Sequence, residues 1–386
     1  MTVHDTAASA ARLRRDLADR LVRTGCLHDP AWREAVESVA REPFLGPAIA
    51  RATEYGDRWE VVRREEMTGD EWLELVYRDE TWVTQVDGVL VEEVRGLACG
   101  VPTSSSTLPG LVVRMLEAAG ISDGEKVLEI GTGTGYSTAL MCHRLGDGAV
   151  TSVEYDRVVA GRARDALADV GYAPTLVVGD GLAGYEGNAE YDRLIATCSV
   201  RYIPIPWLWQ VRDGGTITAP LSGWLGGVAF AHLTVAEDGT ASGRFLKDDV
   251  YFMTARPHGP PPMSSPLLGI GDGRASRVDP RVLDDPAGLF VGQLAAPSAV
   301  KLGGGEEVAL LDVATGSQAT IRPEAAGGWT VRQHGPLRLW DAVEDAVLAW
   351  QEAGSPHQSA YGLTVSAERQ RVWLGDPGGP GWDLPV

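Results

Sequence analysis

The stretch VLEIGTGTGY, residues 127–136, decides the fold of this chain. Its first residues are mostly apolar and predict a buried strand, and glycines at positions 131, 133 and 135 follow directly. Glycine adopts backbone conformations that other residues avoid, so this run allows a tight turn and a close approach of a ligand to the main chain. Because a helix that begins after such a turn presents free backbone N–H groups, the segment predicts a nucleotide site between a strand and a helix.

Helices and short apolar strands alternate around this segment, from Pro109 to about residue 221. The strands are nearly continuous runs of Val, Leu and Ile, which is typical of a parallel sheet that helices cover on both faces. We therefore predict an α/β fold with a doubly wound, Rossmann-like sheet. The expected strands are residues 126–131, 149–155, 175–181, 191–199 and 215–221, and the expected helices are residues 111–120, 137–146, 158–171 and 205–212.

The flanking sequence indicates further parts of the chain. Helices are expected at residues 8–25 and 29–40, with a short one at 68–77. The dipeptide Asp238-Gly239 is a hairpin signal and predicts antiparallel strands that form the edge of the sheet. A stretch rich in Pro and Gly then marks a linker. We predict a main domain at 1–257 with an N-terminal helical cap at about 1–108, a linker at 258–275, and a smaller mixed α+β domain at 276–386 with one helix at 337–354.

The composition limits the partners that we expect. The chain has 386 residues, and its formal net charge of −19 would repel the phosphate backbone of a nucleic acid. No apolar run reaches the roughly 20 residues of a membrane span, and the N-terminus lacks the apolar core of a signal peptide. The cysteines are widely separated and have no histidine at metal-ligand spacing. We expect a cytoplasmic protein without a metal that acts on a peptide or a small molecule, with no nucleic acid and no membrane as partner.

Carboxylates stand at the ends of three successive expected strands, at Glu129, Glu154 and Asp180. A carboxylate inside the glycine turn would repel a pyrophosphate but attract the amino group of a methionine moiety. An acidic residue about 20 positions later can accept hydrogen bonds from both ribose hydroxyls, and Asp180 can accept one from the amine of adenine. Each feature alone also fits a tight junction or a helix cap. Together they favour S-adenosylmethionine (SAM), with S-adenosylhomocysteine (SAH) as its product, over a dinucleotide.

The order of several motifs resembles the protein-L-isoaspartate O-methyltransferase family over about residues 8–257. The motifs are REPFLGP (41–47), TSSSTLPGLVVRML (103–116), VLEIGTGTGY (127–136), SVEY (152–155), VVGDG (177–181), YDRLIATCSV (191–200) and DGGTITAPL (213–221). The resemblance implies a carboxyl methyltransferase that uses SAM. The cofactor-binding residues that it implies are Glu129, Gly131, Thr132, Gly133, Gly135, Tyr136, Glu154, Tyr155, Asp180 and Gly181.

The segment SSSTLP, residues 104–109, resembles the active-site turn of that family. Thr107 stands where the family has a serine, so the hydroxyl that contacts the substrate is Thr107, Ser106 or Ser105, and simple capping of the following helix is the alternative for each. The implied acceptor is a carboxylate, which is already ionised at neutral pH because its pKa is about 4. The reaction then needs no general base, and the enzyme has to orient the carboxylate and exclude water.

The chain continues beyond the part that resembles the family, from residue 258 to residue 386. This extension resembles that of actinobacterial variants associated with ribosomally made peptides, including lanthipeptides and graspetides. The resemblance implies methylation of an aspartate side chain in a cyclised precursor peptide, with an aspartimide as the product. The alternatives are repair of isoaspartyl residues in damaged proteins and a scaffold that keeps the fold without activity. Trp340 and Trp350 lie on one face of the expected helix, and we expect them in the core of the extension.

Overall fold

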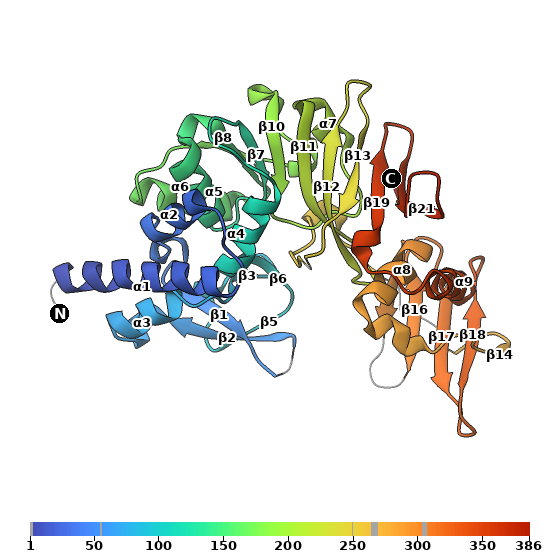
Figure 1. The fold of residues 1–386 in the computed structure, drawn as a ribbon. Helices are drawn as coiled ribbons and strands as arrows, with labels where there is room; N and C mark the ends of the chain where they lie inside the picture. Colours follow the sequence, from blue (N-terminus) through green and yellow to red (C-terminus); the bar gives the residue numbers. More distant parts are fainter. Residues whose placement is uncertain (1–2, 55, 249, 264–268, 303–306) are drawn as a thin grey trace. The chain divides into compact units, whose positions relative to one another are not determined.

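The computed structural model describes residues 3–54, 56–248, 250–263, 269–302 and 307–386 (Figure 1). The chain divides into two compact units. The first holds residues 1–197 and 209–218, and the second holds residues 198–208 and 219–386. The division therefore runs through the end of the expected main domain, rather than through the linker expected at 258–275.

Helices form the N-terminal part of the first unit, as predicted. They are α1 (Val3–Arg23), α2 (Pro30–Ser38) and α3 (Gly69–Val76). Asp29 accepts a hydrogen bond from the backbone of Ala31 and so caps α2. Thr68 and Glu71 form a capping box at the start of α3, which confirms the short helix expected at 68–77.

The cap also contains a sheet that the sequence did not predict. Its strands are β1 (Ala48–Ala52), β2 (Arg58–Arg63), β3 (Trp82–Val86), β4 (Val89–Leu90), β5 (Leu97–Cys99) and β6 (Pro102–Ser106). The order is β4-β3-β1-β2-β5, and β6 pairs with β3. That pairing places Ser105 opposite Val83 and Ser106 opposite Trp82. The segment SSSTLP (residues 104–109), called the hydroxyl segment below, is therefore anchored in the cap through Ser105 and Ser106 before the chain enters the main sheet.

The parallel sheet of the first unit confirms the doubly wound fold. Neighbouring strands are parallel, and helices follow them along the chain (Figure 1). Because parallel strands point the same way, their carboxyl ends meet at one edge. The strands are β7 (Val127–Ile130), β8 (Val150–Glu154), β9 (Thr175–Val178), β10 (Tyr191–Ala196) and the first part of β11 (Val211–Ser222), in the order β9-β8-β7-β10-β11. The helices are α4 (Pro109–Ala118), α5 (Tyr136–Leu145) and α6 (Arg157–Asp169), and α7 (Ile205–Gln210) belongs partly to each unit.

Antiparallel strands follow β11 in the second unit. β12 (Val228–Val235) and β13 (Ala241–Phe245) form the hairpin expected at Asp238-Gly239. The prediction that this hairpin forms the edge of the sheet is wrong, because a strand from the C-terminal end of the chain pairs with β13. The added strands are β19 (Tyr361–Val365), β20 (Gln370–Leu374) and β21 (Gly381–Asp383).

Another sheet, with the helices α8 (Pro286–Ala295) and α9 (Leu339–Glu352), completes the second unit. α9 confirms the helix expected at 337–354, and its Trp340 and Trp350 are buried as expected. α8 was not predicted, since Gly288 and Gly292 weaken its helical pattern. The strands are β14 (Gly273–Ala275), β15 (Ala299–Leu302), β16 (Val308–Asp312), β17 (Gln318–Pro323) and β18 (Trp329–His334), in the order β14-β18-β17-β16-β15.

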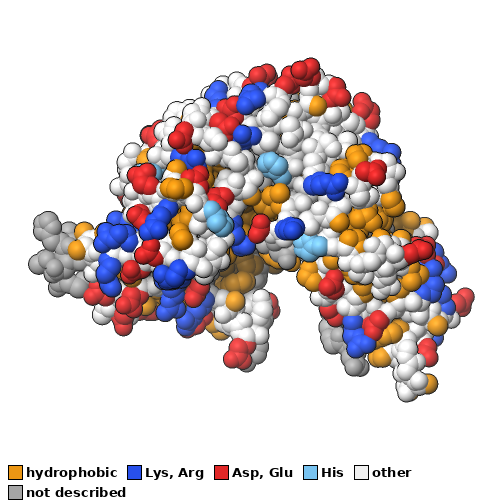
Figure 2. Space-filling view, viewed as in Figure 1, with side chains coloured by type: hydrophobic (Ala, Val, Ile, Leu, Met, Phe, Trp, Pro, Cys, Tyr) orange, Lys and Arg blue, Asp and Glu red, His pale blue; other side chains and the backbone are white. Residues whose placement is uncertain are grey.

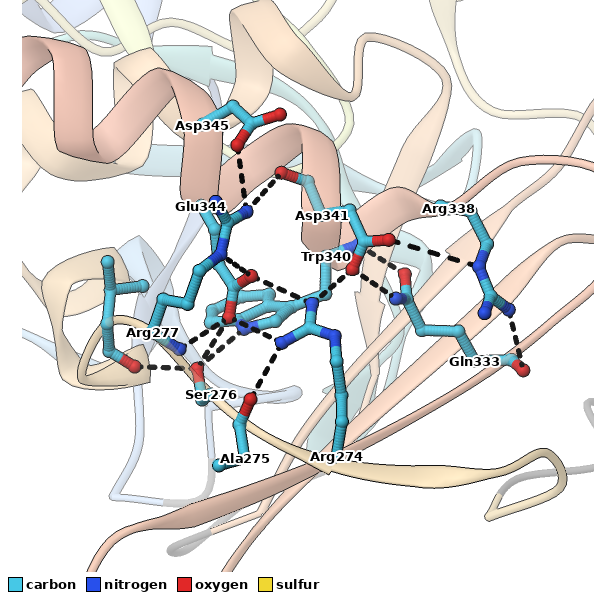
Figure 3. Close-up of polar contacts among 11 residues, drawn as sticks. Arg274, Ala275, Ser276, Arg277, Gln333, Arg338, Trp340, Asp341, Glu344 and Asp345 are labelled. Atoms are coloured by element: carbon cyan, nitrogen blue, oxygen red, sulfur yellow. Dashed lines mark hydrogen bonds and ion pairs between the residues drawn. The ribbon is translucent and has the colours of Figure 1, made fainter.

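A buried polar network joins α9 to the segment that holds β14 (Figure 3). The side chain of Glu344 is fully buried and accepts hydrogen bonds from Arg274 at 2.7 Å and from Arg277 at 2.8 Å. Ser276 donates a further hydrogen bond to Glu344 at 2.9 Å, and Trp340 donates to Ser276 at 2.8 Å. The network therefore fastens residues 274–277 to the helix.

Side chains of both charges occur on the face of the molecule that Figure 2 draws. Within the described part of the chain, no helix is long and apolar enough to cross a membrane.

Candidate active site

The turn after β7 has the geometry that its glycines predict. Gly131, Gly133 and Gly135 have φ values of 99°, 54° and 93°, a region that favours glycine. A Cβ atom on Gly131 would lie 2.8 Å from Oγ1 of Thr197, so a side chain would collide there. Thr197 also donates a hydrogen bond to the carbonyl oxygen of Ile130 at 3.1 Å. Sequence reasoning missed Thr197, which closes the base of the turn.

Glu129 lies beneath this turn, where hydroxyl groups surround it. Its side chain is fully buried and accepts hydrogen bonds from Ser137 at 2.5 Å, Thr138 at 2.5 Å and Ser152 at 2.7 Å. Burial raises the pKa of Glu129, and the three hydroxyl hydrogen bonds only partly offset that effect. The carboxylate thus joins β7 to the first turn of α5 and to β8. It supports the turn from below.

Glu154 ends β8 and meets the glycine turn directly. One of its carboxylate oxygens accepts a hydrogen bond from the backbone N–H of Gly133 at 2.8 Å, and the other accepts one from Asp156 at 2.9 Å. Beside it, the hydroxyls of Thr132 and Ser152 are 2.6 Å apart. The structure therefore brings Glu154, Thr132 and Gly133 together at the carboxyl edge of the sheet.

The segment after β9 reaches the same edge. Asp180 is exposed, and its side chain accepts a hydrogen bond from the backbone of Leu182 at 2.9 Å. A Cβ atom on Gly181 would lie 2.5 Å from Cγ2 of Ile130, so this glycine packs closely over the end of β7. Tyr155, which follows Glu154, is 50% exposed. These residues leave an open, acidic rim around the end of β7.

Tyr136 has a different place from the other predicted cofactor residues. Its ring is buried, with its centroid 5.9 Å from that of Phe44. The guanidinium carbon of Arg41 lies 5.8 Å from the ring centroid of Tyr136. Tyr136 is the first residue of α5. The part that it can present to a ligand is therefore its backbone rather than its phenol ring.

The hydroxyl segment lies against the glycine turn. The carbonyl oxygen of Ser105 is 3.7 Å from the position that a Cβ atom on Gly133 would take. Ser106 is 1% exposed, and its hydroxyl accepts a hydrogen bond from Arg41 at 3.5 Å. Ser105 and Thr107 are half-buried and lie closer to the surface. Of the three predicted hydroxyls, Ser105 and Thr107 are therefore the more accessible to a substrate.

A cavity of about 410 Å³ adjoins both segments. Ser104 from the hydroxyl segment and Thr134 from the glycine turn line it, together with apolar side chains such as Phe44, Leu90 and Val159. Its volume lies in the range of small-ligand pockets, about 300–1,000 Å³. Charged side chains, among them Arg162, Asp165 and Asp169, also line it, so the cavity has both polar and apolar walls.

Comparisons with known proteins agree with this geometry. Residues 57–251 match the family model described as Protein-L-isoaspartate(D-aspartate) O-methyltransferase (PCMT). The chain is 31% identical over 228 residues to Protein-L-isoaspartate O-methyltransferase 2 of Rhodopseudomonas palustris, an alignment that covers 58% of this chain and 97% of that relative. It is 41% identical over 115 residues to Protein-L-isoaspartate O-methyltransferase of Ignicoccus hospitalis, covering 29% of this chain and 54% of that relative, so it spans about half the length of that relative.

A solved structure titled Protein-L-isoaspartate O-methyltransferase has a similar fold. It superimposes with a TM-score of 0.55 at 20% sequence identity, covering 94% of this chain and 100% of that chain. At this identity the likeness concerns the fold alone.

Proposed function

Because the chain belongs to the protein-L-isoaspartate O-methyltransferase family, we propose that it transfers a methyl group from SAM to a side-chain carboxylate of a peptide or protein. The observation that carries the proposal is the approach of Ser105 to Gly133. The carbonyl oxygen of Ser105 lies 3.7 Å from the position that a Cβ atom on Gly133 would take. This approach brings residues 104–109, which we propose to hold the acceptor and call the acceptor segment, next to the glycine turn, which we propose to hold the cofactor. A shared site for both reactants follows.

The residues at the edge of the sheet suit SAM. Gly131 and Gly181 let the turn pack closely against Thr197 and Ile130, and the positive φ of Gly131 shapes the turn that we propose to hold the ligand. We assign Glu154, at the end of β8, to the ribose hydroxyls and the exposed Asp180 to the adenine amine. The fully buried Glu129 supports the turn through its hydrogen bonds with Ser137 and Thr138 at the start of α5. Bound SAM supplies the electrophilic methyl group.

The acceptor segment has to orient a carboxylate rather than activate it. A carboxylate with a pKa of about 4 is ionised at neutral pH, so no side chain has to remove a proton. The hydroxyls of Ser105 and Thr107 can donate hydrogen bonds to a carboxylate oxygen and leave it its charge. Exclusion of water at the site strengthens these contacts and limits hydrolysis. The protein would therefore contribute to catalysis by positioning the carboxylate relative to the methyl group of SAM.

The acceptor that the comparisons favour is an isoaspartyl residue. Relatives and a solved structure with this fold carry the name of that activity. After methylation, the neighbouring backbone nitrogen attacks the ester carbonyl and methanol leaves, which gives a succinimide. The test is incubation with SAM of a peptide that contains one isoaspartyl residue, beside the same peptide with aspartate. We expect a methyl ester, followed by methanol, from the isoaspartyl peptide alone.

An aspartate side chain in a cyclised ribosomal peptide is the second candidate acceptor. The sheet β14–β18 with α8 and α9 lies beyond the residues that match the family model, although a solved structure titled Protein-L-isoaspartate O-methyltransferase covers 94% of this chain and therefore shares most of this part. A folded addition of this size provides surface for recognition of a longer precursor peptide. A macrocyclic aspartyl peptide belongs in the same assay, and turnover of that peptide with none of the linear isoaspartyl one would overturn the first candidate. Turnover of no peptide by a protein that binds SAH would contradict both.

A further inference from the structure

Arg41, in the segment before the Glu42–Phe44 turn, is a fully buried arginine with unusual partners. Its guanidinium donates mainly to backbone carbonyl groups, and none of its hydrogen bonds to the described residues is to a carboxylate. The carbonyl oxygens belong to Val76 at 2.7 Å, Arg78 at 2.9 Å, Glu80 at 3.0 Å, Thr107 at 3.2 Å and Ser106 at 3.5 Å.

The charge of Arg41 is costly at this position. Burial lowers the pKa of Arg41 to about 10, which still leaves the side chain charged at neutral pH. A buried charge without an ionic partner destabilises a fold unless hydrogen bonds satisfy it. Backbone carbonyls accept hydrogen bonds from both Nη atoms here, and two of these carbonyls belong to the acceptor segment. Apart from one hydrogen bond to the hydroxyl of Ser106, the guanidinium of Arg41 therefore holds main chain rather than side chains.

Residues 79–81 hold the opposite side of the same segment. Asp79 accepts a hydrogen bond from the backbone N–H of Gly110 at 2.7 Å, and the hydroxyl of Thr81 accepts one from Leu108 at 3.0 Å. Because the carbonyl and N–H of a trans peptide point in opposite directions, the Thr107–Leu108 peptide unit is held from both sides. The backbone of the acceptor segment has little freedom to rotate.

Arg41 also lies near the first residue of α5, the helix that follows the glycine turn. Its guanidinium carbon lies 5.8 Å from the ring centroid of Tyr136, the residue that follows Gly135. Cation–π attraction operates at such distances. One buried cation thus touches both the acceptor segment and the first residue of α5. Movement of one relative to the other would break contacts of the same side chain.

We propose that Arg41 is a positioning residue for methyl transfer, which holds the backbone of Ser106 and Thr107 in register with the glycine turn. This inference rests on the proposed function for its catalytic consequence. It concerns no contact with SAM, so cofactor affinity should survive its loss. A misplacement of about 1 Å near reacting groups costs about 100-fold in rate.

The test compares Arg41→Lys and Arg41→Met with the matched control Arg63→Met. Arg63 also donates to backbone carbonyls in the cap, those of Glu92 at 3.1 Å and Val94 at 2.5 Å, but touches neither site segment. With SAM and the isoaspartyl peptide as substrates, we expect kcat to fall about 100-fold in Arg41→Met and about tenfold in Arg41→Lys, with the Kd for SAH within twofold of wild type. Arg63→Met should retain kcat within twofold.

Hydrogen–deuterium exchange of the SAH-bound protein gives a readout that does not require turnover. We expect the amides of Ser106, Thr107, Leu108 and Gly110 to exchange at least tenfold faster in both Arg41 variants and at the wild-type rate in Arg63→Met. If Arg41→Met does not fold, Arg41→Lys carries the test. Unchanged exchange and kcat in the Arg41 variants would overturn the inference, and so would a loss of SAH affinity equal to the loss of kcat. Failure of the wild type to methylate any peptide would refute the proposed function, while the exchange rates still decide the role of Arg41.

Discussion

Two fully buried glutamates, one in each unit, have opposite surroundings. Glu129, under the glycine turn, accepts hydrogen bonds from Ser137, Thr138 and Ser152, and burial raises its pKa. Burial alone would also raise the pKa of Glu344, but hydrogen bonds, first of all from Arg274, outweigh burial and hold that pKa below its usual value (Figure 3).

The contrast separates a carboxylate that is paired with cations from one that is surrounded by hydroxyls. The positive charges of Arg274 and Arg277 stabilise the ionised form of Glu344, which fastens α9 to the segment that holds β14. Hydroxyls orient Glu129 without a compensating positive charge, so burial favours its neutral form. A burial pattern alone would not distinguish the two residues. Their partners do.

The largest effect that we expect is on stability, from Glu344→Ala. Removal of one partner from a buried ionic network leaves the others uncompensated, and the free energy of unfolding should fall by about 3 kcal/mol. The matched control is Asp345→Ala, whose ion pair with Arg277 at 2.8 Å is exposed and should contribute less than about 1 kcal/mol. Urea unfolding measures both. Equal losses in the two variants would refute the structural role of Glu344.

Glu129→Ala should have a smaller effect on stability but a clear one on the cofactor. Three hydroxyls would lose a shared acceptor, at a cost of about 2 kcal/mol in unfolding free energy. Because the turn also loses its support, we expect SAH affinity to fall about tenfold, or about 1.4 kcal/mol. Calorimetry checks this against Glu344→Ala, which should bind SAH as the wild type does. The distinction fails if both variants lose affinity alike.

Opposite pH dependence is the smallest effect, on the order of 1 kcal/mol. A raised pKa means that Glu129 stabilises the fold most below its unfolded-state pKa of about 4.3, and that this contribution is lost as pH rises through the folded pKa. A lowered pKa means that Glu344 stabilises the fold above about pH 4.3 and loses this contribution as pH falls. Melting temperatures from pH 3.5 to 8 should therefore rise with pH for Glu129→Gln relative to wild type. They should fall relative to wild type for Glu344→Gln, and slopes of the same sign would contradict the pKa directions.

The main sheet was predictable because β7, β8 and β10 are buried on both faces and therefore read as apolar runs. The cap sheet was not, because a strand such as β2, with the sequence RWEVVR, is half-exposed and mixes charged with apolar residues. α8 was missed because it contains glycines that packing requires: a Cβ atom on Gly292 would lie 2.7 Å from Leu283. Pairing of β19 with β13 joins segments too far apart in the chain for any local signal.

The candidate site was predictable where side chains carry the signal. Glu154 and the glycine turn were both identified from the sequence, and the backbone N–H of Gly133 donates a hydrogen bond to Glu154 at 2.8 Å. Arg41 was not predicted as a site residue, because it acts on backbone carbonyls, which have no signature in the sequence. The buried place of the Tyr136 ring was hidden for a similar reason, since it depends on Arg41 and Phe44 from the cap.

Titration calorimetry with SAH tests the central claim most directly, since every further step depends on the site at the ends of β7 and β8. The wild type should bind one SAH per chain, and Glu154→Ala should bind roughly 100-fold more weakly because two hydrogen bonds to a charged group are lost. Asp345→Ala should match the wild type. No binding by the wild type, or equal affinity of Glu154→Ala and the wild type, would contradict the proposed cofactor site.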